Sequence, residues 1–409
     1  MPTKQRRVIV SVTNDLVTDQ RVHRSCTALC DAGYSVTLVG RRLADSGPLN
    51  RNYKTVRMRL LFRKKAVFYA EYNIRLFLRL IFSKADIFYS NDTDTLLANY
   101  YAAKIRGKLL FFDAHEMFPE VPELVDRNGV KRFWMGIENH IFPKIQKMKP
   151  RAAAVTVCRS IADIYMERYG LEMGVVRNVP MRYETECVEC GDFAKVFPSD
   201  KKILLYQGAV NVGRGLEWVI DAMPHLPQCH LVIAGVGDVY DALVKDVERR
   251  SLEGCVTFLG RVEPSVLHHI TPLADLGLSL LENRGLNYYY SLPNRIADFV
   301  QSGVPVLATD FPEIHRVVEE YGIGSLVPSF ERRTENIEGG TDSSDIKQMS
   351  LKDVEYSPEV LARYISEALA YWEQIPREER ENKFKKASEE LSWEHDKEVL
   401  LECVNRLSM

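Results

Sequence analysis

Two turns in the second half of the chain carry residue types that bind phosphate groups. The first, Gly208–Gly215, follows a short apolar run and precedes a helical pattern. Glycine lets the backbone approach an anion closely, and Arg214 can add a charge-assisted hydrogen bond. The second turn, Ser291–Arg295, opens another predicted helix, whose N-terminus also favours an anion. Each turn alone also fits an ordinary tight connection, but the pair predicts a diphosphate pocket.

A third group of polar residues stands at the end of a predicted strand in the first half. Asp113, His115 and Glu116 directly follow the apolar run Leu109–Phe112. A histidine that titrates near neutral pH can donate or accept a hydrogen bond beside a reacting group, so we predict a catalytic role for these three residues. Asp92, after the preceding strand, belongs to a weaker set that also fits the cap of the next helix.

The elements that position these residues alternate in type along the chain. Short apolar runs alternate with helical patterns twice, before and after a polar stretch near residues 184–200. This pattern predicts an α/β protein with two open parallel sheets and a ligand cleft between them. We expect an N-terminal domain of residues 1–185, a C-terminal nucleotide-binding domain of residues 186–375, and a last segment, 376–409, that packs back on the first domain.

The charge is divided between the two halves of the chain. Met1–Thr185 holds 31 Lys and Arg against 18 Asp and Glu, a balance of +13 within a chain whose net charge is −2. Arg51–Lys84 carries ten of these bases and one acid, Glu71, interleaved with aromatic residues. From Val67 onward, a narrow polar stripe on an otherwise apolar helix fits an anionic membrane surface or a lipid acceptor, or an amphipathic helix packed on the sheet. We expect no nucleic-acid partner, because no recognised binding module is present.

Three further patterns bear on the class of protein. No apolar run approaches the ~20 residues of a membrane span, and Val8–Val12 is better explained as a first strand than as a signal peptide. A single CxxC, Cys187–Cys190, is weak evidence for a metal or redox site, so we predict reduced thiols and no metal.

Together these segments resemble the large retaining glycosyltransferase family 4, of GT-B fold, and the likeness covers nearly the whole chain. The motifs that carry the resemblance are Tyr206–Gly208, Arg214–Glu217, Leu231–Gly237, Phe258–Gly260, Ser291–Arg295, Gly303–Val306 and Pro312–Glu313. In the first half, Asn91–Leu96, Asp113–Glu116 (DAHE) and Arg177–Pro180 resemble a bacterial subgroup of this family, whose second mark is LPNR at Leu292–Arg295.

The resemblance implies roles for individual residues. The diphosphate of a nucleotide sugar would lie on Gly208, Gly213, Arg214, Pro293, Asn294 and Arg295. The backbone around Arg261 and Val262 would meet the base, and His115 would stand beside the reactive carbon of the donor. The acceptor side would be bordered by the loop Asn14–Arg21, with Asn14, Asp15, Asp19 and Arg21, and by Asp92.

One motif departs from the family pattern, which often has two glutamates with seven residues between them. Counted back from Gly303, those two positions hold Tyr290 and Asp298. Asp298 can still bind ribose hydroxyls, whereas Tyr290 cannot replace a carboxylate. Glu282 lies nearby in the sequence and is a candidate substitute.

The function implied is retaining transfer of a sugar from a nucleotide diphosphate donor, of the UDP or GDP type, to a hydroxyl of a saccharide or lipid-linked acceptor. It would need no cofactor or metal and would serve cell-surface polysaccharide or glycolipid assembly, in the cytoplasm or on the inner face of the membrane. A nucleotide-sugar epimerase of the same fold and a non-catalytic sugar-nucleotide-binding module are the alternatives. A dinucleotide oxidoreductase is disfavoured, because no G-x-G-x-x-G follows the first strand.

Overall fold

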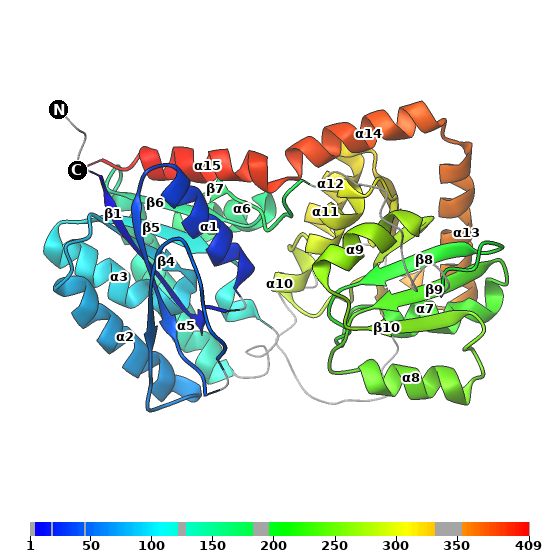
Figure 1. The fold of residues 1–409 in the computed structure, drawn as a ribbon, viewed down its shortest axis with the longest axis horizontal. Helices are drawn as coiled ribbons and strands as arrows, with labels where there is room; N and C mark the ends of the chain where they lie inside the picture. The colour runs from blue at the N-terminus through cyan, green and yellow to red at the C-terminus, as the bar shows by residue number, and fades with distance from the viewer. Residues whose placement is uncertain are drawn as a thin grey trace. The chain divides into compact units, whose positions relative to one another are not determined.

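A computed structural model describes residues 5–17, 19–44, 46–121, 128–182, 196–331 and 354–408 of the chain. The chain divides into two compact units, Met1–Asn178 with Trp393–Met409, and Val179–Ser392. Each unit is built around one parallel sheet with helices on both faces (Figure 1). The predicted α/β class with two parallel sheets is therefore confirmed.

The first unit has a sheet of order β3-β2-β1-β4-β5-β6-β7, in which every pair of neighbours is parallel. Its strands are β1 (Arg7–Asp15), β2 (Ser35–Arg41), β3 (Lys54–Met58), β4 (Ile87–Asn91), β5 (Leu109–Ala114), β6 (Ala152–Thr156) and β7 (Gly174–Val175). Its helices are α1 (Gln20–Asp31), α2 (Lys65–Ile81), α3 (Asp92–Arg106), η1 (Phe118–Glu120), α5 (Asn128–Lys147), α6 (Arg159–Tyr169) and α15 (Trp393–Asn405).

The alternation of side chains along β1 explains how helices cover both faces of this sheet. Val8, Val10 and Val12 belong to one buried cluster with residues of α1 and α15. On the other face, the Ser11 hydroxyl accepts a hydrogen bond of 2.7 Å from Asn99 of α3. A strand covered on both faces reads as an almost continuous apolar run, which is why the sequence marks β1, β4 and β5 clearly.

The second unit has a parallel sheet of order β10-β9-β8-β11-β12-β13 and a separate pair of short strands. Its strands are β8 (Lys202–Gln207), β9 (Cys229–Ala234), β10 (Val256–Gly260), β11 (Leu276–Ser279), β12 (Val306–Thr309), β13 (Gly324–Val327), β14 (Phe330–Glu331) and β15 (Val354–Glu355). Its helices are α7 (Leu216–Ala222), η3 (Met223–His225), α8 (Tyr240–Arg249), α9 (Pro264–Ile270), η4 (Thr271–Leu273), α10 (Leu286–Tyr289), α11 (Asn294–Gln301), α12 (Pro312–Tyr321), α13 (Pro358–Gln374) and α14 (Arg377–Glu390).

Two separate cores hold the second sheet. One packs α7, α8 and α13 on one face, with Trp218 fully buried in it. The other packs α11, α12 and α14 on the opposite face around Phe299 and Phe311. Helices therefore cover both faces of the sheet. In open parallel sheets of this kind, ligands bind at the loops that follow the carboxyl ends of the strands.

The C-terminal helices are shared between the two units. Figure 1 shows α14 beside α11 and α12 of the second unit, and α15 lying on the first unit, where it packs on α1, β6 and β7. The guanidinium of Arg177 binds the buried Asp396 of α15 at 2.6 Å. This division differs from the predicted segment 376–409, of which only α15 belongs to the first unit. The predicted boundary at 185/186 lies outside the described residues.

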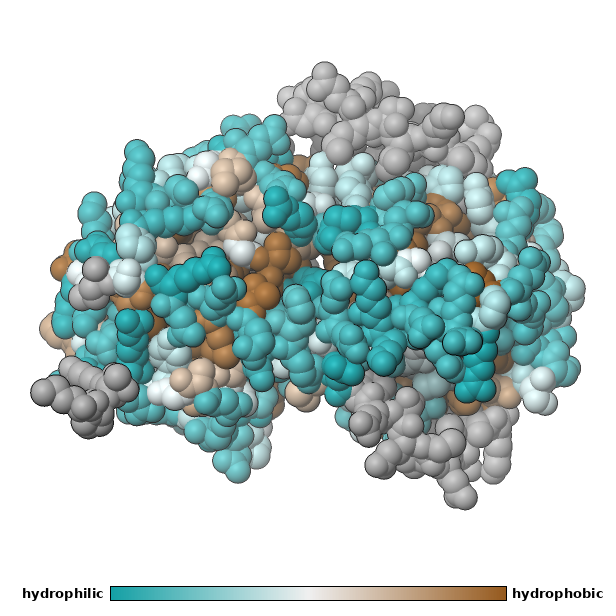
Figure 2. Space-filling view, turned by 90° about the horizontal axis from the view of Figure 1, so that it is seen from above, coloured by the Kyte–Doolittle hydropathy of each residue, from teal (hydrophilic) through white to brown (hydrophobic). Residues whose placement is uncertain are grey.

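The surface is mostly hydrophilic on the face drawn in Figure 2, where hydrophobic residues show only in smaller areas. Among the described residues, none of the helices combines the length and hydropathy that a membrane span needs.

Candidate active site

In the second unit, the ends of β8, β9 and β10 form a compact edge of glycine-rich turns. The amide of Gly208 donates to Ala234 at 2.9 Å, and the amide of Gly235 donates to Gly260 at 2.8 Å. Gly208 and Gly235 have φ of 121° and 152°, and a Cβ at Gly235 would lie 1.8 Å from the carbonyl oxygen of Gly208. Only glycine permits this approach, so the first predicted phosphate turn has the backbone that such a turn needs.

Arg295 is the most unusual side chain at this edge. Arg295 is the second residue of α11 and is only 8% exposed. Its guanidinium carbon lies over the ring of Tyr206, 4.2 Å from the ring centroid. Its Nη1 atom is buried and has no hydrogen-bond partner among the described residues. Burial lowers the pKa of Arg295, and the nearby positive charge of Arg214 lowers it further. A buried cation in this state is suited to an anionic ligand.

Arg214 lies in the same region, as the sequence predicted. Its guanidinium carbon is 5.0 Å from the ring centroid of Tyr288, and its Nε atom is buried without a hydrogen-bond partner in the described part of the chain. The carbonyl of Gly213 accepts the backbone amide of Glu282 at 3.1 Å. Glu282 therefore lies beside the Gly208–Gly215 turn, where it also pairs with Arg284 at 3.6 Å.

The other predicted donor-side residues lie on the neighbouring loops. Pro293 caps α11, Asn294 is its exposed first residue, and Asp298 follows one turn later. Tyr290 ends the short helix α10 and packs edge-on against Tyr289. Arg261 and Val262 directly follow β10, the strand that pairs with β9. All these positions are at the carboxyl edge of one sheet, but their roles toward a ligand stay predictions.

In the first unit, His115 lies between two carboxylates at the ends of β4 and β5. Its Nδ1 atom is 3.4 Å from Asp92, its Nε2 atom is 3.5 Å from Asp113, and its backbone amide donates to Asp92 at 2.7 Å. Burial would lower the pKa of His115, but the two carboxylates outweigh burial and raise it to about 9. The imidazole therefore carries a proton at neutral pH and acts as a hydrogen-bond donor.

Asp113 is completely buried, which changes the role predicted for it. Its carboxylate accepts hydrogen bonds from Arg21 at 2.8 Å and from the Tyr89 hydroxyl at 2.7 Å. Burial would raise the pKa of Asp113, but the charges of Arg21 and His115 hold it well below its usual value. Asp113 therefore exposes no surface that a substrate could contact, and the structure places it behind His115. Arg21, only 6% exposed, likewise supports the site from behind rather than bordering an acceptor.

Asp92 is held in an uncommon backbone conformation. It opens α3 with a φ of 57°, and its side chain binds the His115 amide instead of capping the helix. Two residues on, Asp94 accepts a hydrogen bond of 2.5 Å from Thr13, and burial together with the charge of Asp92 raises its pKa to about 8. Left-handed backbone at a non-glycine residue clusters at functional sites, so the capping alternative does not account for this loop.

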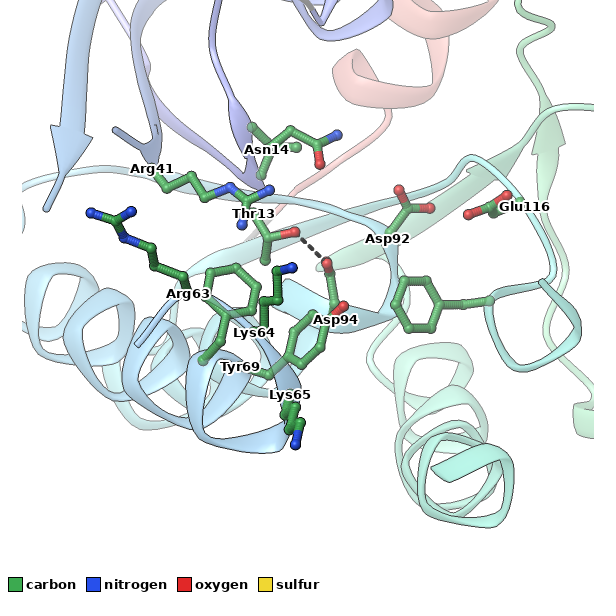
Figure 3. A pocket seen from close by; sticks show the side chains of 13 residues that line it. Thr13, Asn14, Arg41, Arg63, Lys64, Lys65, Tyr69, Asp92, Asp94 and Glu116 are labelled. Carbon is green, nitrogen blue, oxygen red and sulfur yellow. Dashed lines mark hydrogen bonds between the residues drawn. The ribbon is translucent and has the colours of Figure 1, made fainter. Parts of the chain in front are cut away.

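The remaining predicted residues of the first unit separate into two groups. Asn14 and Glu116 line a cavity of about 370 Å³ together with Asp92 (Figure 3). Asp19 is the N-cap of α1, where it accepts the Val22 amide at 3.1 Å. Asp15 binds Ser46 and, at 3.2 Å, Arg57, and these partners outweigh burial and lower its pKa. Asp15 and Asp19 therefore hold the loop in place and do not line the cavity.

Comparison with known proteins agrees with this architecture. Residues 201–337 match the family model described as Glycosyl transferases group 1. The match lies within the second unit and spans about a third of the chain. The chain is also 28% identical over 135 residues to alpha-D-kanosaminyltransferase of Streptomyces kanamyceticus, which covers 32% of this chain and 33% of that protein. The chain thus matches about a third of the length of this curated relative.

Solved structures resemble the chain over nearly its full length. A glycosyltransferase of Rickettsia africae has a TM-score of 0.69 at 14% identity and covers 99% of this chain and 100% of its own. The fold is GT-B. Anabaena HepE, solved in complex with UDP, has a TM-score of 0.68 at 13% identity, with 98% and 100% of the two chains covered. At these identities the likeness shows the fold alone.

Several residues of these two regions had no role assigned from the sequence. Tyr206 and Tyr288 stack on the two arginines, and Arg41 lines the cavity of the first unit from the end of β2. An arginine directly after a predicted strand was the available signal for Arg41. Within the described ranges, no three His, Cys, Asp or Glu are arranged to hold a metal ion, and Cys187 and Cys190 lie outside those ranges.

Proposed function

We propose that this chain is a retaining glycosyltransferase of family 4. It transfers a sugar from a UDP or GDP donor to a hydroxyl of a saccharide or lipid-linked acceptor, in the assembly of a cell-surface polysaccharide or glycolipid. The domain match and the UDP bound in a structural neighbour support a nucleotide-sugar donor. The subgroup with the DAHE and LPNR motifs is supported by Asp113–Glu116 and Leu292–Arg295.

The observation that carries the proposal is the buried, incompletely bonded guanidinium of Arg295. A guanidinium that is 8% exposed, with one nitrogen lacking a partner in the described chain, has been desolvated without full compensation. Arg214 brings a second positive charge to the same place, and Gly208 beside Arg295 has a φ of 121°, which residues with a side chain rarely adopt. A diphosphate supplies the charge and the acceptor oxygens that both arginines lack.

In the proposed reaction the bond between the anomeric carbon and the diphosphate oxygen breaks. The acceptor oxygen forms a new bond to the same face of that carbon, and its proton passes to the departing diphosphate oxygen. Negative charge grows on the diphosphate in the transition state, so Arg214 and Arg295 contribute most at that point. We assign to protonated His115 a hydrogen bond from Nδ1 to the transferred sugar, because Nε2 is buried and faces Asp113, and the charges of Asp92 and Asp113 keep the ring protonated.

We further propose that the enzyme works in the cytoplasm, peripherally on the inner face of the membrane. Large apolar side chains on and before α2 are exposed: Leu61, Phe62, Val67, Ile74, Leu78 and Phe82. Basic residues accompany them in the same segment, among them Arg75 and Arg79. Apolar insertion beside positive charge is typical of a helix that lies on anionic lipid.

Incubation with radiolabelled UDP- and GDP-sugars tests the proposal. We expect the label to pass to an added acceptor, or slowly to water, with release of UDP or GDP. Recovery of an isomerised donor with no transfer would instead identify an epimerase. Donor binding with neither reaction would identify a binding module, and either result would overturn the proposal.

A further inference from the structure

The cavity of about 370 Å³ in the first unit is divided by charge. One part is lined by four basic residues, Arg41 at the end of β2 and Arg63, Lys64 and Lys65 at the start of α2. The other part is lined by the acidic residues Asp92 and Glu116 and by Asp94, whose pKa of about 8 leaves it mostly protonated at neutral pH. Figure 3 shows the ends of Arg41 and Lys64 turned toward Thr13, with Asp92 and Glu116 on the opposite side. The cavity is within the size range of about 300–1,000 Å³ of small-molecule sites.

Among the described residues, these four bases have no carboxylate partner, unlike other bases of this segment. Arg57 is paired with Asp15 at 3.2 Å and Arg75 with Glu71 at 2.7 Å. In the described ranges, no carboxylate lies within 4.0 Å of Arg41, Arg63, Lys64 or Lys65. The Nε atom of Arg41 is buried and has no hydrogen-bond partner among the described residues. The guanidinium of Arg41 lies 4.9 Å from the centroid of the Phe68 ring.

Three of these bases stand where a helix disfavours positive charge. α2 begins at Lys65, has no side-chain cap, and has no acidic residue in its first turn. The N-terminus of a helix carries a partial positive charge, so acids are stabilising there and bases are not. Arg63, Lys64 and Lys65 add three positive charges at this end. The exposed amides of the first turn and the three bases together favour a bound anion.

The acidic part of the cavity suits a different group of the same ligand. Asp92 also binds the amide of His115, the residue to which we assign contact with the transferred sugar. Carboxylates accept hydrogen bonds from sugar hydroxyls but repel an anion. A ligand that spans the cavity therefore places a hydroxyl beside Asp92 and Glu116 and a negative charge beside Arg41 and Lys64.

We propose that the acceptor carries a negatively charged group, a phosphate or a carboxylate, and that Arg41 and the Arg63–Lys65 segment bind it. This inference rests on the proposed function, because it assigns the cavity to the acceptor. The shared chemistry is an anionic group about one sugar away from the reacting hydroxyl. It belongs either to a soluble acidic sugar or to a lipid-linked sugar phosphate.

Binding measured by ligand-observed NMR tests this on the full chain, with saturating UDP present to occupy the second unit. We compare glucose, glucuronate, glucose 6-phosphate and a short-chain prenyl phosphate. We expect each anionic ligand to bind at least about tenfold more tightly than glucose, the scale of one charge-assisted contact. Tightest binding of the prenyl phosphate assigns the lipid-linked source, and tightest binding of either anionic sugar assigns the soluble one.

Variants locate the binding. The double variant Arg41→Met/Lys64→Met should lose the preference for anions while its affinity for UDP is unchanged. Arg42→Met is the matched control, because Arg42 is exposed, follows Arg41 directly and does not line the cavity. If the double variant does not fold, the single variant Lys64→Met replaces it, because the Lys64 side chain is exposed. Equal binding of glucose and the anionic ligands, or a preference that survives in a folded variant, would overturn the inference. A wild-type protein that binds neither UDP nor GDP would instead count against the proposed function.

Discussion

At the scale of single residues, His115 is defined by the two carboxylates on either side of it. With its pKa raised to about 9, the imidazole is protonated throughout the neutral range, and each of its nitrogens has a carboxylate within 3.5 Å. Because the folded-state pKa lies above the unfolded value of about 6.5, this interaction contributes its full stability below pH 6.5. That contribution is lost as the pH rises through about 9.

Replacing His115 tests its part in the reaction. His115→Gln should lower kcat by about 10²–10⁴-fold and leave the Kd for UDP nearly unchanged, because its contact is made in the transition state. In the wild type, kcat should fall as the pH rises through about 9. This fall in kcat should be absent from His115→Gln. His140→Gln, at an exposed histidine of α5, is the control. Wild-type turnover in His115→Gln would remove the residue from the mechanism.

Asp113 should matter for stability more than its position near the site suggests. Asp113→Asn leaves Arg21, 6% exposed, without its carboxylate, so we expect a loss of about 3–5 kcal/mol in the free energy of unfolding. Asp163→Asn, which breaks the exposed pair with Arg159 at 2.9 Å, should cost about 0–1 kcal/mol. Urea unfolding of both variants gives the two values. Similar losses in the two would show that the buried pair is not structurally important.

At the scale of elements, α2 presents two apolar faces. Phe68, Tyr72, Leu76 and Leu80 are buried, whereas Val67, Ile74, Leu78 and Phe82 are at least half exposed. Glu71 and Arg75 of the same helix form an ion pair at 2.7 Å. The sequence left open whether this helix packs on the sheet or lies on a membrane. The buried face of α2 packs on the sheet, and its exposed apolar face is the one that the membrane proposal uses.

Vesicle sedimentation tests the exposed face of α2. We expect binding to vesicles rich in phosphatidylserine at low salt, because each base near the surface contributes about 1 kcal/mol, and weaker binding at high salt. Ile74→Ser/Leu78→Ser should reduce it, whereas Ile105→Ser, at a residue of α3 that is 65% exposed, should not. A wild-type protein that ignores anionic vesicles at low salt would contradict the membrane proposal.

The sequence predicted those elements whose burial is continuous and missed those at the margins. β1, β4, β5 and β8 are buried along most of their length, so their apolar runs stand out. β3 (Lys54–Met58) is an edge strand with only Met58 buried, and the sequence pattern predicts no strand there. The left-handed backbone of Asp92 and the burial of Asp113 come from tertiary contacts, which local pattern cannot reveal.

At the scale of the molecule, the two halves of the chain carry net charges of opposite sign. The first 185 residues carry +13 in a protein whose total is −2. A basic first half suits an anionic acceptor or lipid surface, whereas the donor region of the second half depends on two local arginines. The group 1 domain match falls within that second unit. We therefore propose that Arg214 and Arg295 together hold the diphosphate of a nucleotide.

Isothermal titration calorimetry with UDP, GDP and the two nucleosides tests this claim most directly. We expect UDP or GDP to bind far more tightly than uridine or guanosine, because the arginines contact only the diphosphate. Arg214→Ala and Arg295→Met should each weaken that binding by about 1.5–3 kcal/mol, or about 10–150-fold. The control Arg363→Met, on the exposed surface of α13, should bind as the wild type does. Equal affinity for a nucleoside and its diphosphate, or unchanged affinity in folded Arg295→Met, would contradict the account.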